Sequence, residues 1–201
     1  MGMSVAYVKM SDGYQEGGIA MATKPTRADS DDRFDAPLYT LTEAARYLDV
    51  PPSTLRSWAK GYRRISSERP PVVGAPVLTS IGTRAAPGPV IPFIGLAEGL
   101  VLTAIRHAGV PLQRVRPALA RLDQEFGISH ALASKKLYTD GAEVLFDYAE
   151  SGNDADAARA ARELVVVRNG QRVFTAVIAS YLRRIEFSDD GYAALLHLPA
   201  Y

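Results

Sequence analysis

The sequence predicts an α+β fold that is mainly helical, in which a winged helix-turn-helix is followed by a second helical pair and β-hairpins. Three observations predict it. Apolar residues recur at helical spacing in two pairs of segments, at residues 41–60 and 96–126. Proline or glycine interrupts each pair, so each reads as two helices. Asp-Gly and Asn-Gly steps between β-prone runs, at residues 136–146 and 164–174, are typical of hairpins.

Composition narrows the class of protein. The chain has 201 residues and no cysteine, so it forms no disulfide and no thiolate metal site. No apolar run approaches the ~20 residues of a membrane helix, and we expect a cytoplasmic protein without a membrane partner. We divide the chain into a flexible N-terminal arm (residues 1–37), a winged helix-turn-helix domain (38–92) and a dimer and partner-binding region (93–201).

The helix-turn-helix lies between Tyr39 and Gly61. We expect Thr42 to cap its first helix, because a hydroxyl can accept a hydrogen bond from a free N–H of the first turn. Pro51 ends that helix, and Pro52 suits the first turn of the next one. Residues 38–69 hold six basic and three acidic residues, a local excess of positive charge that favours DNA phosphates. The residues predicted to bind DNA are Thr42, Ser53, Thr54, Arg56, Ser57, Lys60, Arg63, Arg64 and Arg84.

A wing is predicted after the second helix. Residues 76–81 and 89–92 are β-prone, and a turn that contains Arg84 separates them. This order would place Arg84 on the DNA backbone, beside Arg63 and Arg64. An irregular loop fits these residues equally well.

The second helical pair spans residues 96–108 and 112–126, with helix stops at Gly109 and Gly127. We interpret it as core and dimer scaffold rather than a second DNA reader. Leu102 falls outside the apolar face and is expected to mark a contact surface.

Shorter elements complete the chain. Residues 136–146 and 164–174 are predicted hairpins, and residues 154–163 a short exposed helix or linker. Residues 175–184 are a predicted helix with Val177 inward, and residues 185–198 a last hairpin.

Two resemblances to known families add to this interpretation. The run YTLTEAARYLDVPPSTLRSWAK at residues 39–60 resembles the N-terminal helix-turn-helix of MerR-like regulators, with Ser-Thr-Leu-Arg-x-Trp as its most specific part. An ordinary αα-hairpin is the alternative. Residues 93–122, HALASKKLYTDGAEVLF at 130–146, GQRVF at 170–174 and YLRRIEF at 181–187, taken in order, are similar to antitoxins of VapBC-type systems.

The second resemblance implies partners. Such antitoxins bind operator DNA and silence a PIN-domain ribonuclease toxin, and they continue into a further C-terminal helical domain, so we expect more sequence beyond Tyr201. An acidic nuclease pocket would favour basic side chains, and the candidates for toxin binding are Lys135, Lys136, Arg183 and Arg184. A homodimer is expected, because helix-turn-helix proteins usually read two half-sites.

Catalytic chemistry is not indicated. The three histidines are far apart, and no acidic pair, phosphate loop or dinucleotide motif is present. We therefore expect no enzyme, no cofactor and no metal site. Two alternatives to an antitoxin remain: a stand-alone MerR-like regulator that responds to a small molecule, and a scaffold that reuses the fold without binding DNA.

Overall fold

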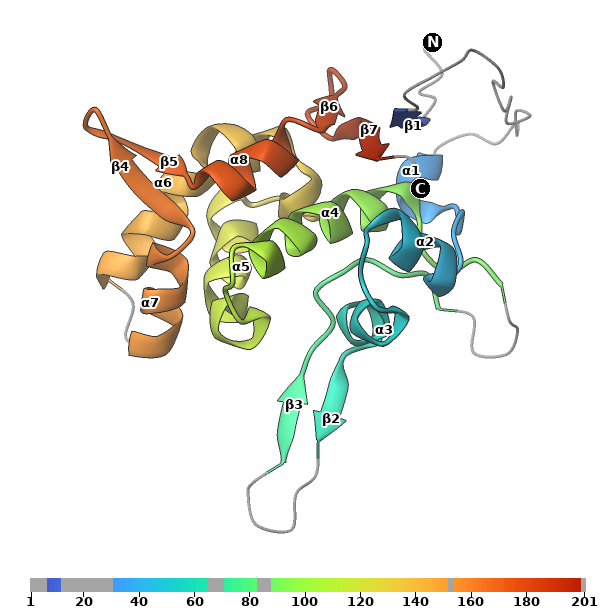
Figure 1. Cartoon of the computed structure of the whole chain (residues 1–201), viewed down its shortest axis with the longest axis horizontal. Coiled ribbons are helices and arrows are strands. Elements are labelled where there is room, and N and C mark those ends of the chain that lie inside the picture. The colour runs from blue at the N-terminus through green and yellow to red at the C-terminus, as the bar shows by residue number, and fades with distance from the viewer. Residues whose placement is uncertain (1–6, 12–30, 65–70, 83–87, 152–153, 200–201) are drawn as a thin grey trace.

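The computed structural model describes residues 7–11, 31–64, 71–82, 88–151 and 154–199, and it confirms an α+β fold that is mainly helical (Figure 1). Its helices are α1 (Asp32–Asp35), α2 (Leu41–Tyr47), α3 (Pro52–Lys60), α4 (Phe93–His107), α5 (Leu112–Phe126), the 3₁₀ helix η1 (Ala131–Ala133), α6 (Lys135–Ser151), α7 (Ala155–Arg162) and α8 (Ala176–Leu182). Its strands are β1 (Tyr7–Ser11), β2 (Tyr62–Arg64), β3 (Val72–Gly74), β4 (Val165–Arg168), β5 (Gln171–Phe174), β6 (Ile185–Phe187) and β7 (Ala193–Pro199).

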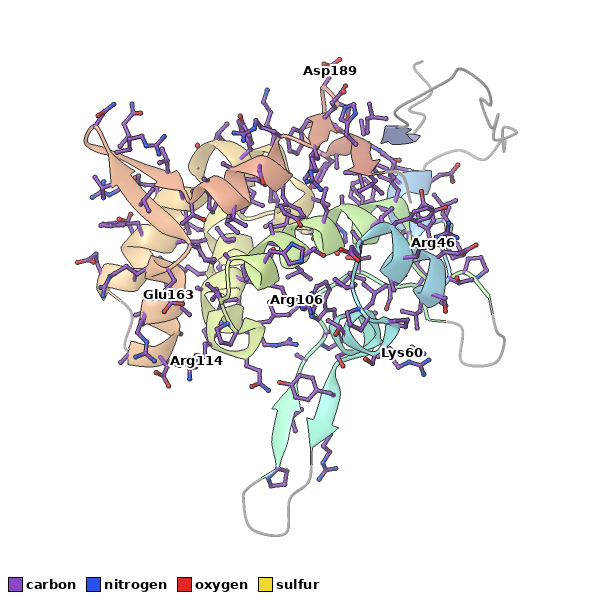
Figure 2. The ribbon with its side chains drawn as sticks, viewed as in Figure 1. Arg46, Lys60, Arg106, Arg114, Glu163 and Asp189 are labelled. Carbon is purple, nitrogen blue, oxygen red and sulfur yellow. The ribbon has the colours of Figure 1, made fainter. Side chains whose placement is uncertain are left out.

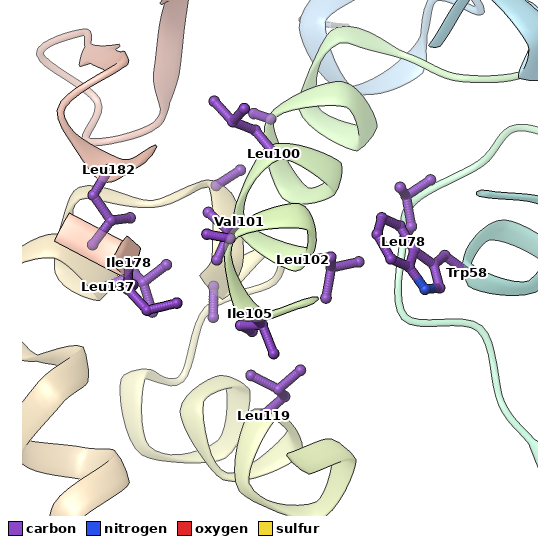
Figure 3. Packing of buried hydrophobic residues seen from close by; sticks show 14 of the residues in the cluster. Trp58, Leu78, Leu100, Val101, Leu102, Ile105, Leu119, Leu137, Ile178 and Leu182 are labelled. Carbon is purple, nitrogen blue, oxygen red and sulfur yellow. The ribbon is translucent and has the colours of Figure 1, made fainter. Parts of the chain in front are cut away.

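Helix α4 lies at the centre of the molecule. Every residue from Phe93 to Ile105 is buried, because elements pack against all sides of this apolar helix. Val101 points to the side of α4 where Leu137 and Ile178 lie, and Ile105 lies next to Leu119 of α5, whereas Leu102 points to the side opposite Val101 (Figure 3). The expectation that Leu102 marks an exposed contact surface was therefore wrong, since its side chain is fully buried.

The helix-turn-helix of α2 and α3 packs on the α4 side where Gly99 lies. A Cβ added at Gly99 would lie 2.5 Å from Cδ1 of Leu48 and 3.1 Å from Cδ1 of Leu78. Leu102, one turn further along, points toward Leu78 and Trp58 (Figure 3). The missing side chain at Gly99 thus lets the helix-turn-helix approach α4 closely.

Helix α6 replaces the hairpin predicted at residues 136–146, which was wrong. Leu137, Gly141 and Leu145 recur every four residues and are buried on one face of α6. A Cβ at Gly141 would meet Cδ1 of Leu137 at 2.8 Å and the Phe174 ring at 3.2 Å, so this glycine serves helix packing rather than a turn. The helical period of the buried residues outweighs the local Asp-Gly signal.

Helix α7 is a real helix, but it is not simply exposed. Asp154 caps it by accepting hydrogen bonds from the N–H groups of Asp156 and Ala157, both at 3.0 Å. Ala157 and Ala161 are buried among the helices. The alanines are therefore the packing face of α7.

The predicted hairpins at residues 164–174 and 185–198 are confirmed. Asn169 and Gly170 adopt φ values of 51° and 77°, as a tight two-residue turn requires. Strands β6 and β7 are antiparallel, and β1 from the N-terminal arm joins β7 in parallel, in the order β1-β7-β6. Within the predicted helix at 175–184, Val177 was expected to face inward but is exposed.

Helix α1 anchors the arm before the helix-turn-helix. Arg33 is buried, forms ion pairs with Asp31 and Asp190, and donates to Ser188 Oγ at 2.8 Å. Burial alone would raise the pKa of Asp190, but the hydrogen bonds from Arg33, Ser188 and the Tyr192 N–H outweigh it and lower that pKa to about 2. Asp31, at the start of α1, is thus tied to the body of the protein through its ion pair with Arg33.

Candidate nucleic-acid interface

One face of α3 carries the predicted DNA-reading side chains. Ser53, Arg56 and Lys60 are exposed and lie three and four residues apart, so they share one side of the helix. Leu55 and Trp58 are buried on the opposite side. The burial of these apolar residues fixes which face of α3 remains available to a partner.

The remaining hydroxyls of α3 are less available. Thr54 and Ser57 are half-buried, and Ser57 Oγ donates to the Ser53 carbonyl at 3.0 Å within the helix. The α3 surface open to a ligand is therefore narrower than the sequence pattern suggested.

Thr40, rather than Thr42, caps α2. The Thr40 hydroxyl accepts a hydrogen bond from the Glu43 N–H at 3.2 Å, and the Glu43 carboxylate accepts from the Thr40 N–H at 2.9 Å. These reciprocal bonds form a capping box. The hydrogen bonds that the Glu43 carboxylate accepts from the N–H and the hydroxyl of Thr40 lower the pKa of Glu43. Thr42 is an exposed residue of the first turn, so the prediction that it caps the helix was wrong.

The hairpin of β2 and β3 projects from the body directly after α3 (Figure 1). Only Gly61 separates Lys60 from β2, and its φ of 71° allows the abrupt change of direction. Arg63 pairs in register with Val73, and both side chains are exposed. Arg64 lies in β2, where its backbone pairs with Val72.

This hairpin is not the predicted wing. Residues 76–81 form no strand, because the end of α3 uses their hydrogen-bonding groups: the N–H groups of Val77 and Leu78 both donate to the Trp58 carbonyl, at 2.8 and 3.2 Å. Residues 89–92 form only an isolated bridge between Tyr39 and Ile91. Arg84 lies outside the described residues.

Four basic side chains of α2, α3 and β2 are not neutralised by carboxylates of the described chain. Among the described residues, Arg46, Arg56, Lys60 and Arg63 form no ion pair with a carboxylate. The arginines that do form such pairs on α5, α7 and β5 are Arg121, Arg159, Arg162 and Arg172. Figure 2 shows Arg46 and Lys60 on the helix-turn-helix, and Arg114 in the first turn of α5. The cations of α2, α3 and β2 are thus available to an anionic ligand.

The candidate toxin-binding residues lie on two separate elements. Lys135 and Lys136 begin α6, are exposed, and line a pocket of about 360 Å³. Arg183 is exposed at the end of α8, and Arg184 lies 4.4 Å from the centre of the Tyr181 ring. Within the described part of the chain, no hydrogen bond or ion pair joins the lysine pair to the arginine pair. The structure therefore does not gather all four into one site.

A polar cluster beneath the helix-turn-helix was not expected from the sequence. The buried carboxylate of Glu98 accepts hydrogen bonds from the Thr79 N–H at 2.6 Å and the Thr79 hydroxyl at 3.0 Å, and it lies 2.9 Å from Nδ1 of His130. The hydrogen bond to Glu98 raises the pKa of His130, although burial of the ring opposes the shift. The only sequence signal was a glutamate within an otherwise apolar helix. The cluster joins the segment after β3 to α4 and η1.

Neither a membrane span nor a metal cluster is found in the described ranges. No described helix is long and apolar enough to cross a bilayer. Across the same residues, no group of three or more His, Asp or Glu side chains is placed to hold a metal ion.

Comparison with known proteins extends the geometric description. A family described as "Putative DNA-binding HTH domain" matches residues 37–119. The chain is 48% identical over 170 residues to "Putative antitoxin VapB45" of Mycobacterium tuberculosis, a match that covers 84% of this chain and 71% of the relative. It is also similar to the crystal structure of Rv2018 from Mycobacterium tuberculosis, with 45% identity, a TM-score of 0.67, and coverage of 80% of this chain and 69% of that one. The helix-turn-helix is thereby confirmed, while its MerR-like character stays a prediction.

Proposed function

Because the chain belongs to the family of the antitoxin VapB45 and carries a helix-turn-helix DNA-binding domain, we propose that it binds operator DNA through α3 and the β2–β3 hairpin, and that it neutralises a cognate PIN-domain ribonuclease toxin. Binding at its own operator would repress the operon that encodes both proteins. We further propose that it acts as a homodimer, since two half-sites about 34–36 Å apart would each receive one α3.

The observation that carries the DNA-binding proposal is the continuity of unpaired cations from α3 into the hairpin. Arg56 and Lys60 are exposed on α3, and Arg63 follows on β2 after a single glycine at the helix end. None of the three is neutralised by a carboxylate of the described chain. A recognition helix with an adjoining basic hairpin suits a major groove and its flanking phosphates.

Titration of the protein against labelled DNA from upstream of its own gene tests this proposal. Arg56→Ala is expected to weaken binding by about 1–3 kcal/mol, the value of a bidentate arginine contact with guanine. The matched control is Arg159→Ala, which removes the same charge from α7, where Arg159 pairs with Asp156 at 3.1 Å. Equal affinities for the two variants would count against α3 as the reading element.

The toxin part of the proposal is tested separately. The neighbouring gene product should co-purify with this chain, and mixing the two should abolish its ribonuclease activity. Reversing the charges of Lys135 and Lys136, or those of Arg183 and Arg184, should identify which exposed basic pair contributes. If no complex forms and the ribonuclease stays active, the toxin part is refuted, whatever the outcome with DNA.

A further inference from the structure

Helix α5 reaches the base of the β2–β3 hairpin through two side chains. Gln113 donates a hydrogen bond through Nε2 to the hydroxyl of Tyr62, which opens β2. Arg116, one turn further along α5, donates through Nη1 to the carbonyl of Ala75, directly after β3. The Arg116 guanidinium also lies 5.8 Å from the centre of the Tyr62 ring. The two strands of the hairpin are thus both tied to one helix.

The base of the hairpin is packed closely enough to transmit these contacts. The Tyr62 ring lies over Gly74, where an added Cβ would be only 2.3 Å from Cε1 of the ring. A Cβ at Gly61 would be 2.4 Å from the Gly74 carbonyl oxygen. Because no side chain intervenes, a displacement of Tyr62 moves both strands together.

The hairpin needs such support to hold one direction. Its described residues form three paired positions, from Tyr62–Gly74 to Arg64–Val72. Isolated two-stranded hairpins are marginal in water at best. Its direction relative to α3 therefore depends on contacts with the body of the protein, and α5 supplies them.

Arg116 is an unusual residue to place there. It is half-buried, and among the described residues no carboxylate pairs with it. Burial disfavours the charged form of its guanidinium and lowers the pKa of the group. Arg121 on the same helix is instead exposed and pairs with Glu125 at 2.8 Å. The half-buried guanidinium has its contacts at the hairpin rather than with a counter-ion.

We propose that Gln113 and Arg116 of α5 are positioning residues, which fix the direction of the β2–β3 hairpin relative to α3 and thereby set DNA affinity without touching DNA. This inference rests on the proposed binding of DNA. It makes the helical region after residue 93 a determinant of operator affinity.

The experiment compares Arg116→Met and Arg116→Lys with Arg121→Met, by fluorescence anisotropy on the upstream DNA at several salt concentrations. Loss of the hydrogen bond to the Ala75 carbonyl should weaken binding about 3- to 10-fold in both Arg116 variants, since lysine keeps the charge but loses the planar fork. The slope of log K against log salt should stay that of the wild type. Arg121→Met should bind as the wild type does.

A double-mutant cycle gives a second readout. Tyr62→Phe and Gln113→Ala each remove one partner of the same hydrogen bond, so their effects on affinity should overlap rather than add. Amide exchange in the DNA-free protein should be faster at residues 62–64 and 72–74 in both Arg116 variants. This measurement reports on the hairpin even without DNA.

The outcomes separate the two proposals. If the wild type does not bind the DNA, the proposed function fails, and this inference fails with it. If the wild type binds and the Arg116 variants match Arg121→Met, only the inference is overturned. It is also overturned if Arg116→Lys retains affinity while Arg116→Met lowers the salt slope by about one, because Arg116 would then contact a phosphate directly.

Discussion

Replacing Leu102 with alanine should be among the most destabilising single changes in this protein. The Leu102 side chain is 0% exposed and points from α4 toward Leu78 and Trp58 (Figure 3). Both of these neighbours are themselves buried. The substitution therefore removes packing at the junction between the helix-turn-helix and the central helix.

The magnitude follows from burial. Leucine to alanine removes three carbon atoms, worth about 2.4 kcal/mol at about 0.8 kcal/mol per buried methylene group. The remaining cavity adds to this loss, because the rigid Trp58 ring and the α4 backbone cannot collapse fully into it. We expect a loss of about 3–4 kcal/mol in the free energy of unfolding.

Urea unfolding followed by Trp58 fluorescence measures this loss. Leu38→Ala is the matched control, because the chemical change is the same while Leu38 is 47% exposed. The control should cost less than about 1 kcal/mol. If Leu102→Ala lowers the free energy of unfolding no more than Leu38→Ala does, Leu102 does not contribute to the packing of the helix-turn-helix on α4, and the argument is refuted.

Two further predictions concern the same part of the molecule. Thr40→Ala should lower the free energy of unfolding by about 1 kcal/mol through loss of the α2 cap, whereas Thr42→Ala should leave it nearly unchanged; equal effects in thermal or urea melts would contradict the capping box. The raised pKa of His130 means that its pairing with Glu98 stabilises the fold fully below the ordinary histidine pKa of about 6.5, and that this contribution is lost as pH rises through the raised value. The stability of the wild type relative to His130→Gln should therefore decline with pH in this window, and a constant difference between pH 5 and 9 would show that the pair does not titrate as argued.

The sequence predicted helices and strands well wherever a local proline, glycine or turn signal agreed with the spacing of the apolar residues. Pro52 and Gly109 mark the start of α3 and the end of α4 as expected, and Asn169-Gly170 forms the turn between β4 and β5. Where the two disagreed, periodicity prevailed. Asp140-Gly141 lies inside α6, because Leu137 and Leu145 bury one helical face against the core.

The candidate interface was predicted in part. The α3 residues Ser53, Arg56 and Lys60 lie on its exposed face, whereas the strands beside them are formed by residues 62–64 and 72–74 rather than by 76–81 and 89–92. Local β-propensity could not reveal this difference, because the N–H groups of Val77 and Leu78 are taken by the α3 carbonyl of Trp58. Which backbone groups are free for strand pairing depends on contacts distant in sequence.

What the sequence alone determined is the helix-turn-helix of α2 and α3. Its turn and its exposed cations follow from residues within about twenty positions of each other, and local chemistry is sufficient to place them. Only the tertiary structure determined how that unit is held. Leu102 and Gly99 of α4 lie where the helix-turn-helix packs on that helix. Glu98 accepts a hydrogen bond from Thr79 in the segment after β3, and Arg116 of α5 donates one to Ala75 at the base of the β2–β3 hairpin. These contacts join residues far apart in the chain, and close packing, rather than any local preference, selects them.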